Sequence, residues 1–89
     1  MFALKAVFSG DVQGVGLRGY CKRTASSFKV SGWVKNDPQG TVIIFAQGDE
    51  SEVEDFLKAV RNGRYVNNIS DMQTNIAESR NINSFVIKY

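Results

Sequence analysis

Residues 10–19 read Gly-Asp-Val-Gln-Gly-Val-Gly-Leu-Arg-Gly and mark the passage from a first strand to a first helix. Four glycines within ten residues are costly to order, so this run predicts a loop with unusual backbone angles. Before the loop, apolar residues on one face predict a strand over Phe2–Ser9: Leu4, Ala6 and Phe8. After it, apolar residues recur in steps of about four and predict a helix: Leu17, Cys21, Ala25 and Phe28.

The rest of the chain continues the alternation of strands and helices. Two β-rich runs, 30–35 and 41–47, are joined by the turn-forming residues 36–40 and predict a hairpin. Residues 51–54 have the spacing of a capping box before an apolar helical stripe, and Gly63 stands where a C-terminal cap belongs. Residues 68–76 and 85–89 predict the last two strands. This β-α-β-β-α-β order, with a short extra C-terminal strand, indicates an α+β, ferredoxin-like split βαβ sandwich, in which two helices cover one face of an antiparallel sheet.

Length and composition narrow the possible functions. At 89 residues the chain is expected to form a single domain, residues 1–89, and to act as a monomer. With no histidine and one cysteine, zinc sites of the usual kind, Cys-His dyads and Ser-His-Asp triads are excluded, and we expect neither metal nor cofactor. There is no apolar run of the roughly 20 residues that a membrane helix needs, and no secretory signal core, so we expect a cytoplasmic protein without a membrane partner. A net charge of +2 from scattered residues does not favour nucleic acid.

The glycine loop has the features of an anion site. The free amides and partial positive charge of a helix N-terminus attract phosphate. A cation in that first turn is unfavourable by roughly 0.3–1 kcal/mol unless an anion lies beside it, and Arg18 is such a cation. Arg18 and the backbone of the loop are therefore predicted to bind phosphate. The predicted phosphate-binding residues are Gly10, Asp11, Val12, Gln13, Gly14, Val15 and Arg18.

The same residues also resemble other motifs. Residues 14–19 match G-x-G-x-x-G, but the dinucleotide fingerprint also needs a parallel second strand in a doubly wound sheet, whereas here a hairpin follows. A Walker A loop is excluded because no Gly-Lys-Ser/Thr follows. Glycines that merely permit a tight turn, with Arg18 solvated, are the plainer alternative. Asn36, at a strand end before Asp37 and Pro38, is by its residue type alone typical of a turn.

Two blocks of sequence resemble the acylphosphatase signature: Val12-Gln13-Gly14-Val15-Gly16-Leu17-Arg18 and Gly32-Trp33-Val34-Lys35-Asn36. The resemblance covers nearly the whole chain, although Leu17 replaces the usual phenylalanine and Asp11 stands where a basic or polar residue is common. It implies hydrolysis of a small-molecule acyl phosphate to carboxylate and inorganic phosphate without a metal. Arg18 would bind the phosphoryl group, and the side-chain amide of Asn36 would orient the attacking water.

Two binding functions on the same fold are the alternatives. An RNA-recognition domain would carry aromatic residues in a defined pattern on a central strand, and residues 40–46 do not match that pattern. A phosphate- or carbamoyl-phosphate-binding domain without efficient turnover is the other, and the departures at Asp11 and Leu17 are consistent with it.

Overall fold

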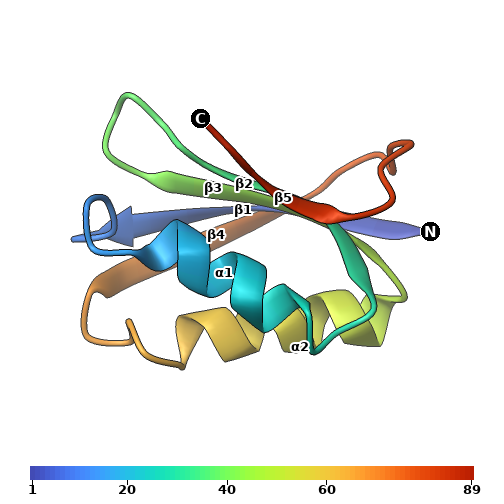
Figure 1. The fold of residues 1–89 in the computed structure, drawn as a ribbon, viewed down its shortest axis with the longest axis horizontal. Coiled ribbons are helices and arrows are strands. Elements are labelled where there is room, and N and C mark those ends of the chain that lie inside the picture. Colours follow the sequence, from blue (N-terminus) through green and yellow to red (C-terminus); the bar gives the residue numbers. More distant parts are fainter.

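The computed structural model describes residues 1–89 and contains five strands and two helices (Figure 1). In chain order these are β1 (Phe2–Gly10), α1 (Leu17–Ala25), β2 (Val30–Asn36), β3 (Val42–Gly48), α2 (Glu50–Arg61), β4 (Ile69–Ile76) and β5 (Phe85–Lys88). The strands form one sheet in the order β4-β1-β3-β2-β5. Pairing is antiparallel except at the edge, where β5 runs parallel to β2. The predicted α+β sandwich is confirmed.

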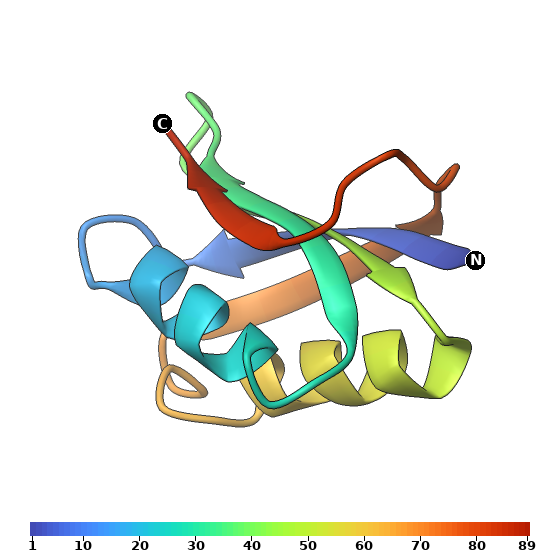
Figure 2. The same ribbon diagram turned by 45° about the vertical axis from the view of Figure 1, so that its right-hand side comes forward.

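Both helices lie on the same face of the sheet, and the opposite face carries no helix (Figures 1 and 2). The alternation predicted for the first strand is correct, since its inward residues are buried in the core: Leu4, Ala6 and Phe8. The apolar stripes of the helices meet them: Leu17, Cys21 and Ala25 from α1, and Val53, Phe56, Leu57 and Val60 from α2. Burying each large apolar side chain stabilises the fold by about 1.5–3 kcal/mol. Neither helix is long and apolar enough to cross a membrane.

The first helix is shorter than its apolar spacing predicts. It ends at Ala25, where the amides of the next three residues bond to carbonyls three positions back and form a tighter turn: Ser26, Ser27 and Phe28. Phe28 is therefore not part of the helical stripe. It still reaches the core, because its ring centre lies 6.1 Å from that of Phe56.

Of the two ends predicted for the second helix, the N-cap is wrong, and Gly63 follows the C-cap directly but lacks the left-handed φ of a capping glycine. The N-cap is Asp49, whose carbonyl accepts the amide of Val53, so Ser51 lies inside the first turn and forms no cap. The C-cap is Asn62, and Gly63 does not have a positive φ. Instead, a Cβ at Gly63 would lie 2.7 Å from the Ala59 carbonyl oxygen and would also collide with the hydroxyl of Tyr20. Glycine is needed there for close packing.

The sheet topology brings three chain segments to one edge. β1 and β2 both pair antiparallel with β3, so they run parallel to each other, and β5 runs parallel to β2. The C-terminal ends of β1, β2 and β5 therefore lie at the same edge of the sheet. The glycine loop after β1, the hairpin turn after β2 and the C-terminus are gathered at that end of the molecule (Figures 1 and 2).

Candidate active site

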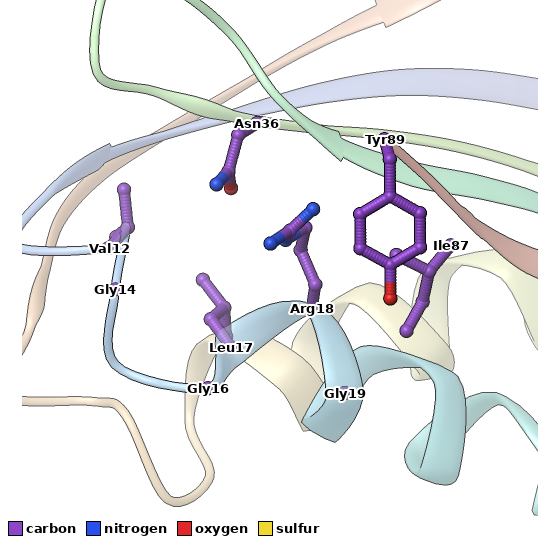
Figure 3. A pocket seen from close by; sticks show the side chains of 9 residues that line it. All are labelled: Val12, Gly14, Gly16, Leu17, Arg18, Gly19, Asn36, Ile87 and Tyr89. Atoms are coloured by element: carbon purple, nitrogen blue, oxygen red, sulfur yellow. The ribbon is translucent and has the colours of Figure 1, made fainter.

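A cavity of about 210 Å³ lies at this edge, between the glycine loop, the start of α1 and the ends of β2 and β5 (Figure 3). This volume is below the roughly 300–1,000 Å³ of pockets that bury drug-sized ligands, so it suits a group as small as phosphate. Its lining residues are Val12, Gly14, Gly16, Leu17, Arg18, Gly19, Asn36, Ile87 and Tyr89. The two predicted catalytic residues, Arg18 and Asn36, which end the two separate sequence blocks, thus line the same cavity.

Backbone atoms form much of the cavity wall. Three of the lining residues are glycines, which can present only backbone. Gly14 and Gly16 have φ of 75° and 94°, in the left-handed region that other residues rarely adopt. None of the amides from Val12 to Gly19 donates a hydrogen bond to a backbone carbonyl. The loop and the first turn of α1 therefore offer a row of free donors, which is what an anion requires.

Two carbonyls of the loop, by contrast, accept hydrogen bonds from side chains outside the loop, and one side chain of the loop bonds to the hairpin. Asn68 donates to the Asp11 carbonyl at 3.1 Å, and the Tyr65 hydroxyl donates to the Val15 carbonyl at 2.8 Å. The Gln13 side chain points out of the loop, and its Nε2 donates to the carbonyls of Asp37 and Thr41 at 2.7 and 2.9 Å. A Cβ at Gly16 would lie 2.9 Å from the Tyr65 hydroxyl, so glycine at this position leaves room for that hydroxyl to reach the Val15 carbonyl.

Arg18 extends from the first turn of α1 toward Asn36 (Figure 3). Its guanidinium carbon lies 4.9 Å from the centre of the Tyr89 ring, within the range of a cation–π contact. The first turn of α1 contains no acidic residue, so no carboxylate from the helix compensates this cation. A planar guanidinium can bind two oxygens of a phosphoryl group with parallel hydrogen bonds.

Asn36 is the last residue of β2, and its side chain points into the same space (Figure 3). Its Oδ1 is the only buried side-chain polar atom of the protein without a hydrogen-bond partner. Leaving a buried acceptor unpaired costs about 1–3 kcal/mol, and native proteins contain few such atoms. An unpaired acceptor beside a cation and free amides can hold a water molecule for reaction.

Not every predicted loop residue lies at the cavity. Gly10 ends β1 and pairs with Ile69 of β4. The Asp11 amide donates to the Asn68 carbonyl at 2.9 Å, so it is not free to bind an anion, contrary to the prediction. The Asp11 side chain is exposed and lies outside the lining. Gln13 and Val15 also lie outside the lining. The Gln13 side-chain amide donates to the hairpin, and the Val15 carbonyl accepts from the Tyr65 hydroxyl.

Several residues of the site were missed by sequence reasoning. Ile87 and Tyr89 line the cavity because β5 adds beside β2 in parallel, with Ile87 paired to Val34. The sequence predicted that residues 85–89 form a strand, but not that this strand pairs with β2. Tyr65 and Asn68 follow α2 with no pattern of their own, so no sequence signal marked them as partners of the loop.

Cys21 lies on α1 away from this chemistry. Its side chain is fully buried, and burial raises the pKa of the thiol from 9.0 to about 12. The neutral thiol is neither a nucleophile nor a metal ligand at neutral pH. The prediction that Cys21 belongs to the apolar stripe of the first helix is confirmed by its place in the core.

Comparisons with known proteins place the chain in one family. The family model for acylphosphatase matches residues 4–87. An acylphosphatase of Archaeoglobus fulgidus is 39% identical over 89 residues, covering all of both chains, and one of Bacillus subtilis is 37% identical over 82 residues, covering 92% of this chain and 88% of that protein. The crystal structure of acylphosphatase from Bacillus subtilis matches with a TM-score of 0.90 at 34% identity over the full length of both chains. The chain therefore belongs to the acylphosphatase family, the hydrolases of acyl phosphates.

Proposed function

We propose that this cavity hydrolyses the carboxyl–phosphate bond of a small acyl phosphate, with Arg18 and the free loop amides binding the phosphoryl group and Asn36 orienting the attacking water. The observation that carries the proposal is that six residues with free amides, one guanidinium and one unpaired buried acceptor line a cavity of phosphate size. The phosphoryl group supplies the negative charge that stabilises a helix N-terminus with an arginine in its first turn.

The reaction follows from these groups. Water, hydrogen-bonded through one hydrogen to Asn36 Oδ1, attacks phosphorus in line with the carboxylate that leaves. The phosphorus–oxygen bond to the acyl group breaks with its electron pair on the carboxylate, and a proton from the water passes to a phosphoryl oxygen or to solvent. Charge spread over the phosphoryl oxygens is met by Arg18 and the amides.

No acid or base of the protein is needed for this step. The leaving carboxylate has a conjugate acid with a pKa near 4, so it departs without protonation at neutral pH. Asparagine can accept a hydrogen bond from water and position it but cannot remove its proton. A chain without histidine can therefore supply all the catalysis by positioning and charge.

The proposed enzyme acts as a monomer on a small molecule. In support of a small substrate, the cavity of about 210 Å³ is too small for a polymer. Nucleic acid is not expected as a partner. Phe45, which stacks on Trp33 on the helix-free face of the sheet, is only 3% exposed and offers little ring surface to a base.

Turnover of benzoyl phosphate by the purified chain, in the presence of a chelator, tests the proposal. Arg18→Ala is expected to lower kcat/KM by about 10³-fold or more, as with other phosphoryl-transfer arginines. Arg23→Ala, which removes an exposed arginine from the same helix, is the matched control and is expected to keep full activity. Absence of turnover by the wild type would leave only a binding function for the cavity, and equal turnover by the wild-type and Arg18→Ala proteins would exclude Arg18 from the reaction.

A further inference from the structure

The Gln13 side chain forms the only hydrogen-bonded link between the glycine loop and the hairpin that carries Asn36. Its Nε2 donates to the Asp37 carbonyl at 2.7 Å and to the Thr41 carbonyl at 2.9 Å. The two other clamps of the loop lead elsewhere: Asn68 precedes β4, and Tyr65 follows α2. The loop and the hairpin turn are 24 and 28 residues apart at these contacts, so their relative position is a tertiary property.

The two carbonyls that Gln13 binds are also the ones that close the turn. The Asp37 amide donates to the Thr41 carbonyl at 2.9 Å, and the Gly40 amide donates to the Asp37 carbonyl at 2.9 Å. Each carbonyl therefore accepts two hydrogen bonds, one from the turn and one from Gln13. Asn36 is bonded covalently to Asp37, so the geometry of this turn sets where the Asn36 amide lies.

Glutamine suits this task by its chemistry. A terminal amide nitrogen carries two hydrogens, and both are used here on two converging carbonyls. Glutamate would present only acceptors to those carbonyls, and methionine of similar length would present none. A shorter asparagine would lose reach by one methylene.

We infer that Gln13 is a positioning residue for the hydrolysis, which fixes the Asn36 amide relative to the phosphate-binding amides so that the water lies in line with the leaving carboxylate. The inference rests on the proposed function, because it needs Asn36 to hold the water. Misplacing a reacting group by about 1 Å can cost on the order of 10²-fold in rate. The Gln13 side chain is not part of the cavity lining, so its effect on the reaction passes through the hairpin.

A double-mutant cycle between Gln13→Met and Asn36→Ala tests this role, with kcat for benzoyl phosphate and the competitive inhibition constant of inorganic phosphate as readouts. We expect Gln13→Met to lower kcat by about 10- to 100-fold while the phosphate constant changes less than about threefold. In the Asn36→Ala background, Gln13→Met is expected to cause less than a threefold further loss, since no positioned water remains to be disturbed.

Tyr65→Phe is the matched comparison, because it removes one hydrogen bond to the loop without touching the hairpin. It is expected to weaken phosphate inhibition rather than to lower kcat selectively. Gln13→Asn replaces Gln13→Met in the cycle if circular dichroism shows the methionine variant unfolded at the assay temperature.

Multiplicative losses in the double variant, or a Gln13→Met effect confined to the phosphate constant, would overturn the inference and leave Gln13 as a residue that only stabilises the loop. A different result marks failure of the proposed function itself. In that case Asn36→Ala alone would leave kcat unchanged, whatever Gln13→Met does.

Discussion

Asn36 combines an energetic cost with a position that stability alone does not explain. Its buried, unpaired Oδ1 costs about 1–3 kcal/mol, and removing an unpaired polar group can be neutral or stabilising. Strain or unsatisfied groups retained at a cavity are typical of functional sites, where activity and stability trade against each other.

We therefore predict that Asn36→Ala lowers kcat by about 10²-fold or more, by analogy with loss of a single transition-state amide, while the inhibition constant of phosphate stays nearly constant. The free energy of unfolding in urea is expected to stay the same or to rise by up to about 1 kcal/mol. A residue that only formed the turn would behave differently. Its loss would destabilise the protein and reduce phosphate binding along with kcat.

Cys21 gives a second prediction at the scale of a residue. Because its pKa is about 12 in the folded protein and 9.0 ordinarily, the unfolded chain ionises first as pH rises. Its stabilising contribution is complete below pH 9 and is lost between pH 9 and pH 12, by up to about 1.4 kcal/mol per pH unit.

The difference in unfolding free energy between the wild type and Cys21→Ala, followed from pH 7 to pH 11, measures this loss and cancels the tyrosines and lysines that both proteins share. Iodoacetamide should modify Cys21 much more slowly in the native protein than in urea. A constant difference across the whole range, or rapid native alkylation, would show that the thiol is solvated.

At the scale of the elements, the pairing of β2 with β3 depends on a glycine that does not line the cavity. Gly32 has φ of 149°, and a Cβ there would lie 2.8 Å from the carbonyl carbon of Phe45 and overlap its oxygen. The two strands pair through this position, with Trp33 opposite Phe45. A side chain at Gly32 must therefore push the strands apart.

Gly32→Ala is predicted to destabilise the protein by about 2–4 kcal/mol, from backbone strain and overpacking together. Gly40→Ala is the control: its φ is 97°, but nothing lies within 4 Å of its Cβ position, so only the left-handed strain of about 1–2 kcal/mol applies. Urea unfolding of the two variants measures both. Equal losses would mean that the strands separate without cost.

At this scale, apolar periodicity, β-propensity and turn-forming residues together predicted the existence and type of all seven elements but not where the helices end. The stripe of α1 extends to Phe28, yet the helix ends at Ala25, because the apolar ring reaches the core equally well from a turn. The capping-box spacing predicted an N-cap at Ser51, but the N-cap is Asp49, one of several polar residues able to begin the helix. Local patterns at helix ends are degenerate, and tertiary packing selects among them.

At the scale of the whole molecule, we expect the proposed phosphate binding to be coupled to folding. The cavity is assembled from residues 12–19, Asn36 and the chain end, segments that come together only in the folded sheet. A ligand bound there stabilises the native state by mass action, about 1.4 kcal/mol at ten times its dissociation constant.

We predict that inorganic phosphate at that concentration raises Tm by about 6–11 °C, given about 4–8 °C per kcal/mol for a domain of this size. Arg18→Ala should abolish most of the shift, and sodium chloride at the same ionic strength should not reproduce it. A shift of equal size in Arg18→Ala would indicate that phosphate acts elsewhere on the surface or through general salt effects. Calorimetry of the wild type and Arg18→Ala provides the measurement.

Residue type and spacing along the chain determined the order of strands and helices and the inward faces of β1 and α2, and they carry the prediction of an anion site at Arg18 and the glycine loop. These depend on local physics: periodicity, helix termini and the conformational freedom of glycine. Tertiary structure alone decided that Asn36 faces Arg18, that β5 contributes Ile87 and Tyr89, and that Gln13 links the loop to the hairpin. The reason is that strand order and register join residues far apart in sequence, and no local pattern encodes which strand becomes the neighbour of another.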